Sequence, residues 1–132
     1  MLNQTGVETN VYGAPAKTIL VDEFNSTAFS VVVNATGVSA DSDGKKIIKA
    51  GTPLYGSLEA RNTAFTVTGG EGATPVGIAL HDVDVTGLTG NATRNSQILV
   101  FGFVDLNKLD ASVVTALTSA VRASLNMIKF VK

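Results

Sequence analysis

The 132-residue chain has no cysteine and no tryptophan, and it contains a single histidine, His81. Without cysteine, neither a disulfide framework nor a thiolate site can form. His81 has no histidine or cysteine partner with which to build a zinc site or a nucleophile–base pair. We therefore expect a protein that is not an enzyme and that carries no metal ion or cofactor.

Charge is also scarce, because 16% of the residues are charged and the formal net charge is −1. A nucleic-acid-binding protein needs a basic stripe, and the longest cationic run, Lys45 and Lys46 with Lys49 nearby, fits a solvated strand end better. No run approaches the roughly 18 apolar residues of a membrane helix, and residues 1–6 (MLNQTG) do not resemble a signal peptide. We expect neither nucleic acid nor a membrane as a partner, and no export by the usual route.

Valine, threonine, alanine and glycine are abundant instead. A surface that combines these residues with little charge exposes apolar area. On a small protein, exposed apolar area often marks a contact surface. The composition therefore favours a component of an assembly.

Residues 24–103 are typical of short β-strands separated by turns. Residues 63–68 (TAFTVT) alternate with period two, so Phe65 should face inward. Residues 75–85 (PVGIALHDVDV) indicate a buried strand that continues with alternation. The most apolar strand, residues 97–104 (QILVFGFV), is expected at the centre of a sheet.

One helix is predicted near the C-terminus. Asp110 is a candidate N-cap, and Leu109 and Val114 have the spacing of a hydrophobic staple. Asn126 is a candidate left-handed stop, and residues 128–131 form a short last strand. The apolar face of this helix consists of Val113 or Val114, Leu117, Val121 and Leu125. The predicted fold is therefore mainly β (α+β), a compact barrel-like body with one C-terminal helix.

Residues 1–20 differ from this body. Gly6, Gly13 and Pro15 interrupt any periodicity, and apolar residues are sparse over most of the segment. This pattern favours an extended arm, and a disordered tail without a role is the alternative that composition leaves open. The chain is thus expected to divide into an arm, residues 1–20, and a single β-rich domain, residues 21–132.

One compact group of candidate ligands occurs, at His81, Asp82 and Asp84. Alternation would place His81 on the face opposite the two carboxylates, and calcium needs six to eight oxygen ligands, so a solvated strand end is favoured over a cation site. Residues 41–44 (DSDG) are incomplete as a calcium loop and predict a plain turn. Residues 69–72 (GGEG) lack the helix and lysine of a phosphate loop.

Three segments resemble bacteriophage head-decoration and head-fibre proteins. Residues 48–55 (IKAGTPLY) are similar to a family strand that ends in a Lys-Ala-Gly-Thr turn. Residues 73–86 (ATPVGIALHDVDVT) are similar to a Pro-Val-Gly-Ile strand that runs into a His-Asp-Val-Asp corner. Residues 100–109 (VFGFVDLNKL) resemble an element that a helix and a terminal Ile-Lys-Phe strand follow in the family. The resemblance covers about residues 45–132, and residues 1–44 match poorly.

The resemblance implies a β-tulip-like body, related to the lambda-type head-stabilising proteins, that binds the major capsid protein on the outside of a virion. Family members often form trimers at three-fold or quasi-three-fold positions and stabilise the shell. A homotrimer is therefore expected, present in the host cytoplasm before assembly. In the arm, Thr18, Ile19, Leu20 and Val21 are expected to dock on the capsid by adding a strand to an exposed sheet edge.

A host-surface or glycan-binding module displayed on a virion is the alternative function. It predicts a cluster of exposed aromatic side chains, for which Tyr12, Tyr55 and some of the phenylalanines are available. An enzyme would need converging ionisable groups, which the spacing of the sequence does not offer.

Overall fold

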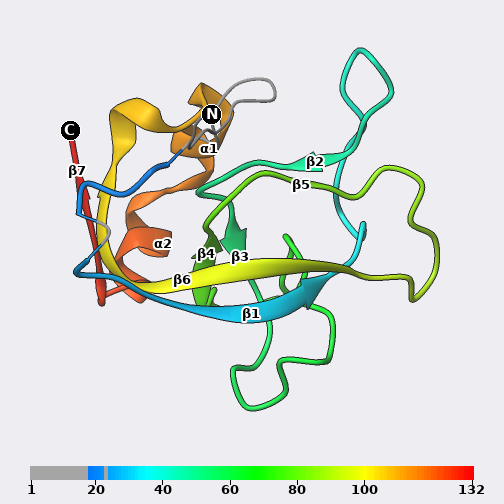
Figure 1. Cartoon of the computed structure of the whole chain (residues 1–132), viewed down its shortest axis with the longest axis horizontal. Helices are drawn as coiled ribbons and strands as arrows, with labels where there is room; N and C mark the ends of the chain where they lie inside the picture. The colour runs from blue at the N-terminus through cyan, green and yellow to red at the C-terminus, as the bar shows by residue number, and fades with distance from the viewer. Residues whose placement is uncertain (1–17, 23) are drawn as a thin grey trace, which may run out of the picture.

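The computed structural model describes residues 18–22 and 24–132, and it is mainly β with two short helices near the C-terminus (Figure 1). This confirms the predicted mainly-β class. The elements are β1 (Thr27–Val33), β2 (Ile47–Ile48), β3 (Pro53–Leu54), β4 (Gly77–Ala79), β5 (Val83–Asp84), β6 (Arg94–Asp105), the 3-10 helix η2 (Leu106–Lys108), α1 (Ala111–Ala116), α2 (Ser119–Ser124) and β7 (Ile128–Val131).

Strand β6 is the centre of the main sheet, as predicted from its apolar sequence. Its first two-thirds pair with β1 on one side, and Ile98 and Leu99 pair with β4 on the other, both antiparallel. Its last four residues pair in parallel with β7. The strand order is β1-β6-β4-β3, and β2 and β5 form a separate two-stranded ladder. The sheet is not closed, so the expected barrel-like closure is wrong.

The middle of β6 is buried on both faces. Ile98 and Leu99, which are consecutive and therefore point to opposite sides, are both 0% exposed. Each contributes to a separate apolar cluster. The helix-side cluster contains Ile19, Leu20, Ala50, Ile78, Leu99, Val104, Leu109, Val113, Leu117, Leu125 and Ile128. The loop-side cluster contains Val31, Val33, Ile48, Leu54, Phe65, Ala79, Val83, Val85 and Ile98.

The inward orientation predicted for Phe65 is confirmed, because this side chain is fully buried in the loop-side cluster. The strand predicted around it is reduced to two isolated bridges, Val33 with Phe65 and Tyr55 with Thr66. The buried ring of Phe65 therefore holds residues 63–68 in place, because this segment forms two isolated bridges instead of a continuous strand pairing.

The single helix predicted after residue 110 is two helices, so that prediction is wrong. Leu117 has non-helical backbone angles, and the Thr118 hydroxyl accepts a hydrogen bond from the Val121 N–H at 3.3 Å, which starts α2. Asp110 lies at the N-cap position of α1 without a side-chain cap bond and pairs with Lys49 at 3.1 Å.

The predicted left-handed stop at Asn126 is also wrong, because no described residue other than glycine has a positive φ. The apolar face is confirmed by the burial of Val113, Leu117 and Leu125.

Among residues 18–22 and 24–132, no helix has the length and apolar character of a membrane span.

The predicted boundary of the N-terminal arm at residue 20 is wrong. Ile19 is 0% exposed and Leu20 7% exposed, and both belong to the helix-side cluster. The Asp105 N–H donates to the Ile19 carbonyl at 2.9 Å, and Leu20 bridges Val104 in antiparallel fashion. These two apolar side chains are part of the core because β6 offers an edge on which this segment can pair. The rest of the arm, residues 1–17, lies outside the described residues.

Two glycines in the segments that resemble decoration proteins allow close packing. A Cβ on Gly77 would lie 2.5 Å from the Leu99 carbonyl oxygen, because β4 is pressed against β6 at this point. Gly51 has a φ of +93°, and a Cβ there would lie 2.7 Å from Leu109 Cδ2. Both positions therefore exclude a side chain for reasons of fold.

We predict that Gly77→Ala lowers the free energy of unfolding by about 1–3 kcal/mol, because the methyl group must displace backbone of β6. Gly70→Ala is the matched control, since nothing lies within 4 Å of a Cβ there, and it should change stability by less than about 0.5 kcal/mol. Denaturant titration of both variants measures the difference. Equal stability of the two variants would show that β4 and β6 are not packed as described.

Candidate functional site

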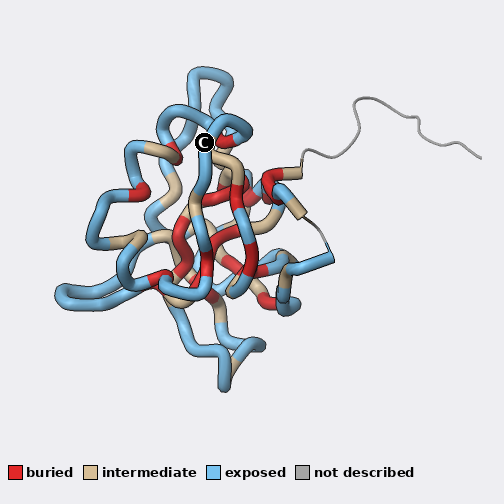
Figure 2. The backbone as a smooth tube through the Cα atoms, turned by 90° about the vertical axis from the view of Figure 1, so that its left-hand side faces the viewer, coloured by how far each residue is buried: buried red, intermediate tan, exposed pale blue. Residues whose placement is uncertain are grey.

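Large apolar side chains gather in solvent at one end of the molecule. Eight large hydrophobic residues of the described chain are exposed, and six of them lie where the last part of β6 meets β7 and residues 20–27. This region is on the left in Figure 1 and faces the viewer in Figure 2. We call it the apolar end, and it consists of Val21, Phe24, Phe101, Phe103, Met127 and Val131.

The segment before β1 brings two of these residues to β6. The Val21 N–H donates to the Phe103 carbonyl at 2.9 Å, which places Val21 beside that residue. Further along the same edge, Thr27 is the partner of Phe101. Phe24 lies between these two contacts, on the connection that links them. One edge of β6 therefore has Val21 beside Phe103 and Thr27 beside Phe101, and Phe24 lies between these two residues in the sequence.

The other edge of β6 brings the two remaining members. In the parallel pairing with β7, Val131 is the partner of Asp105. The residue before β7, Met127, accepts a hydrogen bond from the Gly102 N–H at 3.3 Å through its carbonyl. Lys129, the partner of Phe103, is the charged residue of β7 that is closest in register to the phenylalanines. The apolar end is thus assembled from both edges of one strand.

A change in the course of β6 accompanies this exposure. Gly102 has a φ of +148°, and the register with β1 shifts between Thr27 and Ala28. Phe101 and Phe103 flank this glycine, and they are 42% and 46% exposed although their strand is the centre of the sheet. Two aromatic side chains left in water at such a position mark a surface that a partner can cover.

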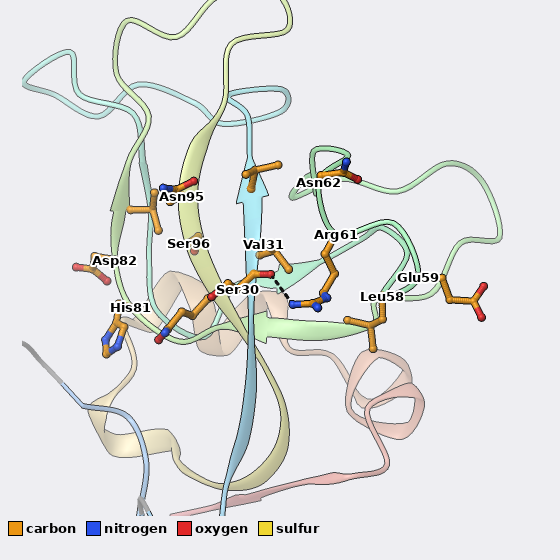
Figure 3. Close-up of a pocket in the computed structure, with 13 residues that line it drawn as sticks. Ser30, Val31, Leu58, Glu59, Arg61, Asn62, His81, Asp82, Asn95 and Ser96 are labelled. Carbon is orange, nitrogen blue, oxygen red and sulfur yellow. Dashed lines mark hydrogen bonds between the residues drawn. The ribbon is translucent and has the colours of Figure 1, made fainter.

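A groove of about 860 Å³ lies at the opposite part of β6 (Figure 3). Its floor includes Ser30 of β1 and Ser96 of β6, with His81 and Asp82 on one side and Arg61 on the other. The Arg61 Nη1 donates to the Ser30 carbonyl at 3.2 Å, and its guanidinium lies over the Phe29 ring at 5.3 Å from the centroid. Arg61 is therefore held against β1 rather than directed at His81.

The carboxylates of the His-Asp-Val-Asp corner make local hydrogen bonds. Asp82 Oδ1 accepts from the Ala50 N–H at 2.7 Å, and Asp84 Oδ1 accepts from the Thr86 N–H at 2.9 Å. Hydrogen bonds from the hydroxyl and the backbone N–H of Thr86 hold the pKa of Asp84 below its usual value. In the part of the chain that the structure describes, no three ligand-type side chains are grouped so as to hold a metal ion.

The strand predicted over residues 75–85 is interrupted at this corner. The chain bends at His81, so that β4 belongs to the main sheet and β5 to the ladder with β2. The predicted strand alternation, which would place His81 on the face opposite Asp82 and Asp84, therefore does not apply, because residues 80–82 are not in a strand. The solvated character expected for this group agrees with the exposure of His81, Asp82 and Asp84.

The capsid-docking residues proposed from the sequence are not brought together on the surface. The side chains of Ile19 and Leu20 are buried, and only Val21 of the four belongs to the apolar end. Phe101 and Phe103 were not singled out as site residues, because the apolar strand over residues 97–104 was expected at the centre of a sheet. Their separation by one residue, Gly102, is the pattern that could have indicated an exposed aromatic pair.

Neither the comparison with protein-family models nor that with curated proteins finds a match to this chain.

We predict that Asp82→Ala lowers the free energy of unfolding by about 1–3 kcal/mol, because the N–H of buried Ala50 then lacks its acceptor. Asp82→Asn retains an acceptor oxygen and should lose less. Asp43→Ala, at an exposed turn position, is the control and should be within about 0.5 kcal/mol of the parent protein. A loss for Asp82→Ala no larger than that of the control would remove this structural role.

Proposed function

We propose that this chain is a decoration protein of a tailed-phage head, which binds the major capsid protein on the outside of the shell and stabilises it. The observation that carries the proposal is the apolar end, a cluster of exposed aromatic and aliphatic side chains on an otherwise well-packed body. The class of partner comes from the resemblance of residues 45–132 to decoration proteins. A non-enzymatic role is part of the proposal.

The apolar end has the composition of a protein contact. Aromatic residues and methionine are enriched at the centres of protein interfaces, and Phe24, Phe101, Phe103 and Met127 are of these types. Burying a phenylalanine side chain completely contributes about 1.5–3 kcal/mol, so covering several partly exposed ones supplies useful affinity. This end is therefore the surface that we assign to the capsid.

A trimer at three-fold or quasi-three-fold positions extends the proposal. A symmetric trimer presents three apolar ends to three equivalent capsid patches. The linked contacts then act at a high effective concentration, so each single contact can be weak. In this arrangement the protein is on the exterior of the virion and, before assembly, in the host cytoplasm.

Residues 18–22 agree with this assignment. The Asp105 N–H donates to the Ile19 carbonyl and the Val21 N–H donates to the Phe103 carbonyl, so this described segment lies along β6 beside the apolar end. Of the four residues expected to dock, Thr18, Ile19, Leu20 and Val21, we retain only Val21 as part of the apolar end, because the side chains of Ile19 and Leu20 are buried.

The groove favours a second candidate function, binding of a glycan at the host surface. Its volume of about 860 Å³ is within the range of small-molecule sites, and the side chains of Asn62, Asn95 and Gln97 could bond to sugar hydroxyls. No phenylalanine or tyrosine is among the residues that line it, although sugar-binding sites commonly use such a ring as a stacking surface. The apolar end therefore carries the stronger proposal.

We predict that Phe101→Thr combined with Phe103→Thr weakens binding to capsids that lack the protein at least tenfold, about 1.4 kcal/mol, because the apolar contact is lost. Threonine keeps β propensity, so the fold should be retained. Leu58→Thr is the control, since Leu58 is 38% exposed but lies outside the apolar end. Co-sedimentation at increasing protein concentration measures the affinity.

The same variants are examined for oligomeric state by sedimentation velocity. We expect the double variant and the control to retain the trimer of the parent protein. A double variant that is monomeric would assign the apolar end to the contact between subunits instead. Failure of the parent protein to bind capsids would contradict the proposed function itself.

A further inference from the structure

Strand β1 is an outer strand of the main sheet, with β6 on one side and a free edge on the other (Figure 1). Its sequence, TAFSVVV, contains no charged residue, glycine or proline, and most of its residues are β-branched or aromatic. Short strands of this composition pair readily with a copy of themselves when an edge is exposed. The free edge of β1 therefore needs protection if the chain is not to associate through it.

The fold covers the end of this edge but not its beginning. The Phe65 N–H donates to the Val32 carbonyl at 2.8 Å, and Phe65 bridges Val33. The first four residues of β1, Thr27–Ser30, are all exposed. Backbone groups of alternate residues point to the same edge of a strand, so the Ser30 carbonyl points to the same edge as that of Val32. Ser30 is thus the next position at which another strand could pair.

Arg61 occupies this position (Figure 3). Its Nη1 donates to the Ser30 carbonyl at 3.2 Å, and its guanidinium lies over the Phe29 ring at 5.3 Å from the centroid. A guanidinium only donates, so it satisfies the carbonyl without offering the alternating donors and acceptors that a further strand requires. A strand that paired here would also have to displace or bury the positive charge.

We infer that Arg61 protects the free edge of β1 and keeps it from pairing with β1 of a second copy of this chain. A second copy supplies the same uncharged strand with its own free edge, and two such edges can pair antiparallel about a two-fold axis. Strand β7, which also pairs with β6 alone, has a charged residue of its own, Lys129. Strand β1 has none and receives its charge from the loop after β3. The inference does not depend on the proposed function, because it concerns copies of this chain alone.

The test compares Arg61→Ala with Lys108→Ala by sedimentation velocity over a range of concentrations. Each variant removes one exposed positive charge, but Lys108 lies in η2, outside the sheet. We expect Arg61→Ala to form larger species at a concentration about tenfold lower than the parent protein requires, because the Ser30 carbonyl becomes available to a second copy. Lys108→Ala should sediment as the parent protein does, since a more negative net charge by itself opposes association.

The double variant Arg61→Ala, Ser30→Pro separates pairing at the edge from aggregation of unfolded chains. The Ser30 N–H points away from β6, so proline removes a donor from the free edge without removing a hydrogen bond to β6. We expect the double variant to return to the sedimentation of the parent protein. A folded double variant that associates as strongly as Arg61→Ala would overturn the inference.

Hydrogen exchange of Arg61→Ala gives a second measurement that does not require the proline. The Ser30 amide should exchange more slowly at high protein concentration than at low, because it donates to a second copy only in the associated state. Association without added protection at Ser30 would contradict the role given to Arg61, and so would an Arg61→Ala variant that sediments as the parent protein does. Neither result bears on the proposed function, which the binding of the parent protein to capsids tests.

Discussion

The pairing of β6 with every neighbour in the main sheet is the constraint on which the molecule depends. This strand supplies the partner for β1, β4, β7 and the segment around Leu20, and its consecutive residues Ile98 and Leu99 separate the two apolar clusters. The apolar part of β6, which begins at Ile98, contributes to both clusters and continues past the point where both faces of the strand are covered. Phe101 and Phe103 stand at that point, and the surface proposed to bind a capsid follows from it.

In the segments that resemble decoration proteins, several residues serve the packing and hydrogen bonding of the folded body. Gly51 and Gly77 allow close approach of the backbone to Leu109 and Leu99, and Asp82 accepts the hydrogen bond of a buried N–H. The apolar end includes Phe101 and Phe103 of the segment 100–109, whereas its most exposed residue, Phe24, lies in the poorly matched N-terminal third.

Short strand patterns separated by turns predicted the mainly-β class, the period-two pattern of residues 63–68 predicted the burial of Phe65, and the apolar run of residues 97–104 predicted the central position of β6. They could not predict the burial of Ile19 and Leu20, because the free edge that accepts this segment is formed by a strand some 85 residues further along. The break of the C-terminal helix at Thr118 was hidden because Leu117, Val121 and Leu125 keep helical spacing across it. The apolar end was not predicted, because the apolar run of β6 continues from its buried part into its exposed part, and the two phenylalanines on either side of Gly102 were the one available signal.

Cryo-electron microscopy of the parent phage particle tests the central claim most directly. The account predicts density for this protein on the outer shell at three-fold or quasi-three-fold positions, with the apolar end against the capsid surface. Density in which this end faces solvent, or an outer shell without the protein, would contradict it.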